Sequence, residues 1–239
     1  MGAITGFFAT IIGYPMQWIY SVVNNYGVSI IILTLLIRLC LLPLYAKQIK
    51  SSAKMAELQP KMKELQAKYA NNREKLNEEM SKLYEQAGTK PTSGCLPLLI
   101  QLPIIYGLFA LLRNPLTYMT SSNMIAAVHE SFFWINDLSQ PDAWLLPILA
   151  GVTTYFTSAV SMSAAEGAGG MMNGMKYFMP VIIFLMGRSF PAGLALYWTI
   201  GNCFMIVQTV IFNRKKKKQK AQEEAEAEVL KRMRKEGIK

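Results

Sequence analysis

Long apolar stretches separated by polar segments dominate the sequence. Candidate membrane spans lie at about 27–46, 95–112, 144–162, 175–190 and 192–213. A helix rises 1.5 Å per residue, so about 20 apolar residues cross the hydrocarbon core of a bilayer. The pattern therefore predicts an all-α polytopic membrane protein with five core transmembrane helices.

Residues 1–25 carry a different pattern. Apolar pairs recur at helical spacing and polar residues fall between them: the pairs are Phe7/Phe8, Ile11/Ile12, Trp18/Ile19 and Val22/Val23, and the polar residues are Thr10, Gln17, Ser21 and Asn24. An amphipathic helix with a tryptophan at its edge is typical of a helix that lies in the membrane interface. We predict an N-terminal interfacial helix, with a sixth span as the alternative.

The segment 47–90 has the pattern of two helices that pack on each other. Apolar residues and tyrosine alternate at three- and four-residue spacing: Met55, Leu58, Met62, Leu65 and Tyr69, and then Leu76, Met80 and Leu83. This heptad spacing favours a helical hairpin over a solvated loop, with the first four residues as its expected contacts. Asn71 and Glu74 resemble a capping box that would begin the second helix.

The distribution of charge orients these elements. The chain has 239 residues and a net charge of +10, but only 17% of its residues are charged and 52% are hydrophobic, which is typical of a membrane protein. Of the 25 Lys and Arg residues, 21 lie in 47–90 or in the tail 214–239. Basic segments beside membrane spans stay in the cytoplasm. We therefore expect three regions, namely an external helix (1–25), a membrane core (26–213) and a cytoplasmic basic tail (214–239).

The predicted external segment, about 113–143, and the cysteines offer little chemistry. Aromatic residues at its end predict a belt at the outer headgroups: Phe132, Phe133, Trp134 and Trp144. His129 is the only histidine and has no evident partner set, so we interpret it as a surface residue. The cysteines, Cys40, Cys95 and Cys203, have no metal-binding spacing, and no P-loop, HExxH or GxSxG motif is present. We expect no cofactor, no metal and no enzymatic activity.

Arg38 is the candidate functional residue with the clearest physical argument. It lies about two-thirds along the first span, where insertion scales put the cost of an arginine at roughly 2.5–3.5 kcal/mol. The predicted spans contain no Asp or Glu to pair with it, and a cation–π contact with Trp198 or Tyr45 would replace little of its hydration. We infer a water-filled cavity that is open to the cytoplasm and attracts the acidic residues of an incoming chain.

Other polar residues within the spans are candidates to line the same cavity. Thr34 lies one helical turn before Arg38. The others are Gln101 in the second span, Thr153, Thr154 and Ser158 in the third, and Asn202 and Gln208 in the fifth. For each of these taken alone, the alternative is a hydrogen bond that holds two helices together.

Four stretches of the sequence, within about 26–213, carry a resemblance to a known family. They are LTLLIRLCLLPLYAKQIKSSAKMAELQPKM, KLYEQAGTKPTSGCLPLLIQLPIIYGLF, FFWINDLSQPD and MPVIIFLMGRSFPAGLALYWTIGNCFMIVQ. Together, and in this order, they resemble the YidC/Oxa/Alb family of membrane protein insertases. The chain is similar to the short form that is typical of Gram-positive bacteria.

The resemblance implies a fold and a site. It implies five core helices around a hydrophilic groove that is open to the cytoplasm and to lipid. Arg38 matches the arginine of that groove, and Thr34 matches the polar position one turn before it. Trp198, preceded by Tyr197, matches the aromatic position that lies against an inserting helix. Ser158 stands where many relatives carry a glutamine, so the groove contact at this position is shorter.

The resulting functional hypothesis is a non-enzymatic membrane insertase and chaperone of the bacterial cell membrane. Its expected partners are nascent membrane proteins and lipid, with the ribosome and the Sec translocon as further candidates and no DNA. The basic residues Arg214, Lys215, Lys216, Lys217 and Lys218 would bind either ribosomal RNA or anionic lipid. The alternative is a channel or transporter in which a single intramembrane arginine forms an anion site.

Overall fold

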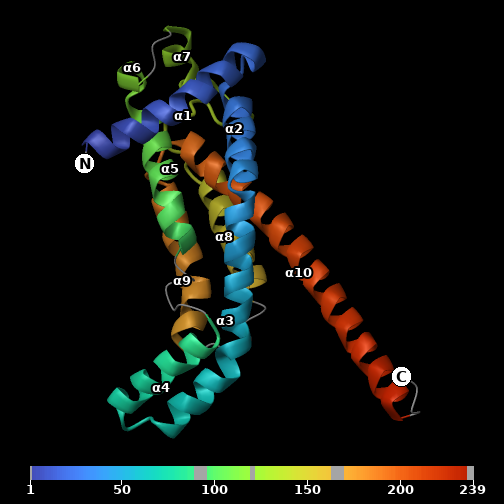
Figure 1. Ribbon diagram of the computed structural model, residues 1–239. Helices are drawn as coiled ribbons and strands as arrows, with labels where there is room; N and C mark the ends of the chain where they lie inside the picture. The colour runs from blue at the N-terminus through green and yellow to red at the C-terminus, as the bar shows by residue number, and fades with distance from the viewer. Residues whose placement is uncertain (1, 89–95, 119–121, 163–169, 236–239) are drawn as a thin grey trace.

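The computed structural model describes residues 2–88, 96–118, 122–162 and 170–235, and these residues are almost entirely helical (Figure 1). The helices are α1 (Gly2–Val23), α2 (Tyr26–Cys40), α3 (Leu42–Lys68), α4 (Arg73–Gln86), α5 (Leu96–Arg113), α6 (Pro115–Tyr118), α7 (Ser122–Ala127), α8 (Leu145–Met162), α9 (Gly170–Gly187) and α10 (Ala192–Lys235). Within the described ranges there is no β-strand, only an isolated bridge between Phe132 and Ile135. The predicted helical class is confirmed.

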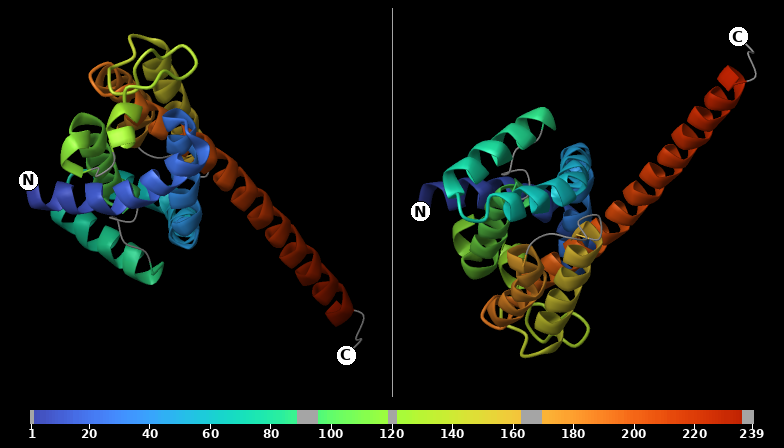
Figure 2. Two further views of the ribbon diagram at one scale, coloured as in Figure 1. Left: turned by 90° about the horizontal axis from the view of Figure 1, so that it is seen from above. Right: turned by 90° about the horizontal axis from the view of Figure 1, so that it is seen from below.

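The helices form an elongated bundle with an extension at each end. Helices α2, α5, α8, α9 and the first part of α10 lie side by side, with contacts between α8 and α9, α8 and α10, and α2 and α10. Helix α1 crosses one end of this bundle, and the α3–α4 hairpin lies at the other (Figure 1). The second part of α10 leaves the bundle and projects away from it, as both views in Figure 2 show.

Helix α1 packs against α5 through a face that the sequence pattern did not identify. Its buried residues are Ala9, Ile12, Met16 and Ile19, whereas Phe7, Ile11, Tyr14, Trp18 and Val22 are exposed. The predicted apolar pairs are therefore split, because adjacent residues of a helix point about 100° apart. The close approach to α5 depends on Gly107, where a Cβ atom would lie 2.8 Å from the Ile12 side chain.

The first predicted span is not one straight helix. Helix α2 ends at Cys40 and α3 begins at Leu42, and the two are bent by 60° at this break. Pro43 explains the break, because it has no amide hydrogen to donate to the preceding turn and its ring crowds that turn. The stretch predicted as 27–46 is thus α2 together with the first turn of the hairpin helix α3.

The hairpin of α3 and α4 forms with the predicted interface. Leu58, Met62 and Leu65 are partly buried, and the Tyr84 hydroxyl lies 3.9 Å from the Met62 sulfur. The Met55 side chain lies outside the described part of the structure. Asn72, and not Asn71, caps α4, because its side-chain oxygen accepts a hydrogen bond from the Lys75 amide at 3.1 Å.

The lengths of the apolar helices differ from the predicted spans. Among the described residues, Ala192–Glu226 is long and apolar enough to cross a membrane, and the bent pair of α2 and Leu42–Ser51 passes the same test as one span. Shorter apolar helical stretches are Gln101–Arg113, Leu145–Val160 and Lys176–Gly187. Helix α9 begins before the predicted 175, and α10 continues through 213 into the tail as one helix.

Candidate functional site

Arg38 lies in the last turn of α2, inside the helix bundle, and only 5% of it is exposed. Its Nε and Nη1 atoms have no hydrogen-bond partner. It forms no salt bridge with any acidic residue in the described ranges, as the distribution of Asp and Glu predicted. The expected exposure to a wide aqueous cavity is not observed, because neighbouring side chains cover the guanidinium group in this structure.

Two residues from other helices enclose the guanidinium group. The ring of Tyr45 on α3 lies with its centre 5.2 Å from Cζ of Arg38, a cation–π arrangement. On α10, Gly201 brings the backbone close to the group, and a Cβ atom there would lie 2.5 Å from Nη2. The 60° bend between α2 and α3 brings Tyr45, only 1% exposed, over Arg38.

A buried polar pair lies nearby on α5 and α10. Gln101 donates a hydrogen bond through Nε2 to the Tyr197 hydroxyl at 2.5 Å, and both side chains are buried. Thr34, also buried, donates to the carbonyl oxygen of Ile30 in its own helix at 2.6 Å. The hydroxyl of Thr34 therefore bonds its own backbone, which is common for threonine in apolar helices.

A second polar cluster joins α8 to α10. Trp198 donates from its indole Nε1 to the Thr154 hydroxyl at 2.9 Å. The side-chain amide of Asn202 makes the most hydrogen bonds when its oxygen accepts from Thr154 Oγ1 at 2.9 Å and from Trp198 Nε1 at 3.1 Å. Ser158 lies one turn beyond Thr154 on α8 and is partly buried. Trp198, Thr154 and Asn202 thus hold two helices together, the alternative that the sequence left open for isolated polar residues.

The opposite end of the bundle from the hairpin contains a carboxylate that sequence reasoning missed. Glu130 accepts a hydrogen bond from the Tyr26 amide at 2.7 Å and a short one from the Tyr20 hydroxyl. The hydrogen bond to Glu130, together with partial burial, raises the pKa of Tyr20 to about 12. Glu130 therefore ties the loop after α7 to the junction of α1 and α2, and nothing in its local sequence distinguishes it from a solvated acid.

His129 has neighbours that the sequence did not reveal. Its Nδ1 atom lies 3.0 Å from Asp137 Oδ2 and 3.0 Å from Ser139 Oγ. Partial burial raises the pKa of Asp137, but hydrogen bonds from Ser139 and His129 outweigh it and hold the pKa below its usual value. A catalytic triad requires the acid and the serine on different ring nitrogens, whereas here both approach Nδ1. The arrangement fits a hydrogen-bonded loop.

Aromatic side chains lie against Lys176, within α9, and against Arg188, just after its end. Cζ of Arg188 lies 4.3 Å from the centre of the Trp144 ring, and Nζ of Lys176 lies 5.4 Å from that of Tyr155. Trp134 and Phe133 are exposed, as the predicted aromatic belt requires. Phe132 instead packs against Gly27, where an added Cβ would lie 2.3 Å from its ring.

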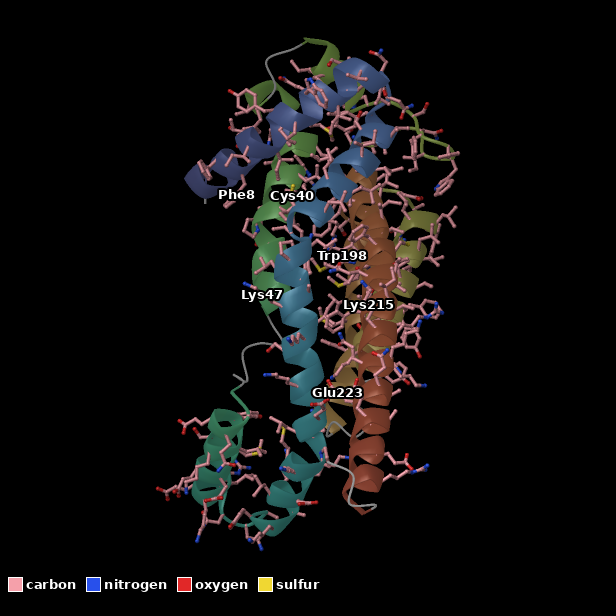
Figure 3. All side chains as sticks on the ribbon, turned by 45° about the vertical axis from the view of Figure 1, so that its right-hand side comes forward. Phe8, Cys40, Lys47, Trp198, Lys215 and Glu223 are labelled. Carbon is pink, nitrogen blue, oxygen red and sulfur yellow. The ribbon has the colours of Figure 1, made fainter. Side chains whose placement is uncertain are left out.

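The basic tail begins beside the hairpin. Lys216 pairs with Glu57 of α3 at 2.9 Å, and the other four residues of the cluster are exposed: Arg214, Lys215, Lys217 and Lys218. Figure 3 shows Trp198, Lys215 and Glu223 in succession along α10. In the described ranges, no group of three or more His, Cys, Asp and Glu residues has the geometry of a metal site.

Comparison with known proteins decides the family. The sequence profile of the family described as 60Kd inner membrane protein matches residues 18–220. The membrane protein insertase YidC 2 of Listeria innocua is 38% identical over 229 residues, which cover 92% of this chain and 76% of that protein. YidC of Clostridium perfringens is 42% identical over 215 residues, covering 85% of this chain and 87% of that protein. This chain belongs to the YidC/Oxa/Alb family.

A solved structure of the YidC family has the same fold. It is described as an active YidC insertase crystal structure with the first transmembrane domain resolved, and it superposes with a TM-score of 0.67 at 29% identity. The match covers 87% of this chain and 47% of the solved one, so this chain spans about half the length of that YidC protein. The predicted family resemblance is confirmed.

Proposed function

We propose that this chain is a membrane protein insertase and chaperone of a bacterial cell membrane. Its family supports this, since the relatives from Listeria and Clostridium are named membrane protein insertases. The observation that carries the proposal is Arg38, a cation buried in an apolar helix bundle with Nε and Nη1 unpaired. Such a group is a binding site for an anionic ligand, and the carboxylates of a membrane-bound polypeptide supply one.

The proposed architecture has five core helices around a groove, with the N-terminus outside and the C-terminus inside. The hairpin and the basic tail carry most of the cations and meet through Lys216 and Glu57, which supports a common cytoplasmic side. At the other end, Trp134, Trp144 and Arg188 have the composition of a headgroup layer. The exposed stripe of α1, with Trp18 70% exposed, suits a helix lying in that outer interface.

The proposed mechanism places polar substrate segments against Arg38 and apolar ones against lipid. An acidic N-terminal segment of a nascent protein enters from the hairpin side, and its carboxylate accepts hydrogen bonds from Nε and Nη1 of Arg38, which have no other partner. Pairing the two charges lowers the cost of moving that segment through the bilayer. The apolar helix of the substrate then passes Trp198 into lipid, where burial of its apolar surface drives release. No covalent chemistry is required.

The decisive experiment is insertion into vesicles that contain the purified chain. The substrate is a single-span protein with an acidic N-terminal tail, and the readout is protection of that tail from external protease. We expect Arg38→Ala to abolish insertion and Arg38→Lys largely to retain it, because both arginine and lysine attract a carboxylate. Neutralising the acids of the substrate should remove the requirement. Equal insertion by Arg38→Ala and the unmodified chain would refute the proposed role.

We propose that the exposed basic residues of the tail contact ribosomal RNA. Four basic residues lie exposed just beyond the membrane core, and phosphate binding by such clusters weakens as salt increases. Deleting 214–239 should abolish salt-sensitive co-sedimentation of the chain with ribosomes. Unchanged co-sedimentation would mean that the tail only anchors the protein to anionic lipid. Cooperation with the Sec translocon is a further proposal of the same kind, which co-purification with the channel tests.

A further inference from the structure

Gly201 brings the backbone of α10 close to the guanidinium group of Arg38. A Cβ atom built on Gly201 would lie 2.5 Å from Nη2, 3.1 Å from Nε and 3.2 Å from Cζ. Carbon and nitrogen atoms without a bond between them do not approach to 2.5 Å, so any other residue at 201 has to displace the guanidinium group. Glycine is unfavourable in the interior of a helix by roughly 0.5–1 kcal/mol relative to alanine. This glycine lies well inside α10, which spans Ala192–Lys235.

An aromatic ring also lies against the guanidinium group. Tyr45 lies with its ring centre 5.2 Å from Cζ of Arg38, and it comes from α3, beyond the bend at Leu41. Arg38 is thus confined by the backbone of one helix and a side chain of another, although neither supplies a hydrogen-bond acceptor to Nε or Nη1. Confinement fixes the direction of the group and leaves its donors available.

We propose that Gly201 and Tyr45 are positioning residues for Arg38. Gly201 provides the space for the guanidinium group against α10, and Tyr45 holds it there with Nε and Nη1 available to a substrate carboxylate. This inference rests on the proposed function, because it assumes that Arg38 binds acidic segments. Its physical basis is preorganisation. A binding group that is already held in place loses less conformational entropy when it meets its ligand.

The test uses Gly201→Ala in the vesicle assay with the acidic-tailed substrate. We expect insertion to slow by about tenfold or more, the effect of losing one charge-assisted hydrogen bond. The matched control is Gly174→Ala on α9, where an added Cβ meets nothing within 4 Å, and which should insert normally. Helix propensity changes in the same direction in both variants, so it does not explain a difference between them.

Two further measurements separate positioning from a folding defect. Gly201→Ala should still insert the substrate whose acids have been neutralised, because that substrate does not require Arg38. Combining Gly201→Ala with Arg38→Lys should restore insertion to the level of Arg38→Lys alone, since the lysine ammonium lacks the broad planar group that meets the new Cβ. Equal slowing for both substrates, or no rescue by lysine, would overturn the proposal.

Tyr45 provides an independent arm. Tyr45→Leu removes the aromatic face over Arg38 and should slow insertion of the acidic substrate, whereas Tyr45→Phe keeps the ring and should slow it less. Identical rates for the two variants would overturn the part assigned to Tyr45. If Arg38→Ala itself has no effect, the proposed function fails; if Arg38→Ala abolishes insertion and Gly201→Ala does not, only the positioning inference fails.

Discussion

Replacement of Glu130 by alanine should destabilise the protein more than any other change in the loop after α7. Its carboxylate accepts hydrogen bonds from the Tyr26 amide, at the start of α2, and from the Tyr20 hydroxyl. Tyr26 is fully buried, so its amide would be left without a partner, which costs roughly 1–3 kcal/mol. Loss of a negative charge at a helix N-terminus adds roughly 0.3–1 kcal/mol.

The expected sum is roughly 1.3–4 kcal/mol, which corresponds to a fall in Tm of about 3–16 °C for a chain of this size. The measurement is thermal unfolding in detergent, followed by circular dichroism at fixed protein and detergent concentration. Asn136→Ala, an exposed residue of the same loop, is the control and should leave Tm unchanged. Tyr20→Phe removes one of the two hydrogen bonds and should give a smaller fall. A Glu130→Ala variant that melts with the Asn136→Ala control would show that the loop is not anchored through this carboxylate.

Three further changes have defined outcomes. Asp142→Ala removes the acceptor of the Leu146 amide and should lower the free energy of unfolding by about 1 kcal/mol at neutral pH. Hydrogen bonds, which outweigh partial burial, lower the pKa of Asp142 below 3.8, so the difference from the unmodified chain should vanish at a pH below this lowered pKa. A difference that persists at that pH would contradict the assigned role of the Asp142 carboxylate. Phe133 has a left-handed backbone conformation, with φ of 52°, and an 85% exposed ring, so Phe133→Asn should leave Tm in detergent unchanged or raised. Binding of the chain to vesicles should weaken, because the exposed ring is lost. A lowered Tm would argue against backbone strain at Phe133. Thr154→Val should cost about 0.5–2 kcal/mol in detergent unfolding because Trp198 loses an acceptor, and a neutral result would mean that Asn202 alone satisfies the indole.

The sequence predicted Arg38 as a site residue, because this prediction depends only on which residue types occur within each predicted span. Arg38 could be identified because no acidic residue occurs in any predicted span, and that statement needs only the order of residues. The two helices of the hairpin followed from the spacing of Leu58, Met62 and Leu65 for the same reason. A cation–π contact of Arg38 with Tyr45 was one of the two contacts that the sequence offered, the other being with Trp198, and the structure contains the one with Tyr45.

The pattern of hydrophobic and polar residues did not predict contacts between segments that are distant in the sequence. Nothing in the sequence around Gly201 shows that it lies against Arg38, because this contact forms only when α2 packs against α10. Glu130 likewise resembles any acidic loop residue, because its hydrogen bond to the Tyr26 amide joins residues 104 positions apart. The packing of α1 on α5 was not predicted for a related reason. Both sides of that helix are apolar, and only packing against α5 decides which one is buried. For Arg38, the sequence predicted the lack of an acidic partner but not the burial of its guanidinium group.

Because α10 is continuous, the helix bundle fixes both the distance of the tail from it and the rotational orientation of the tail about the axis of α10. One helix of 44 residues runs from Ala192 to Lys235, so Gly201 and Lys216 are joined by about 22 Å of unbroken backbone. A single residue inserted after Asn213 would lengthen this path by only 1.5 Å but rotate everything beyond it by about 100°. The basic cluster would then face another direction with its composition unchanged. A change in rotational phase would thus separate Lys216 from Glu57 without removing either charge.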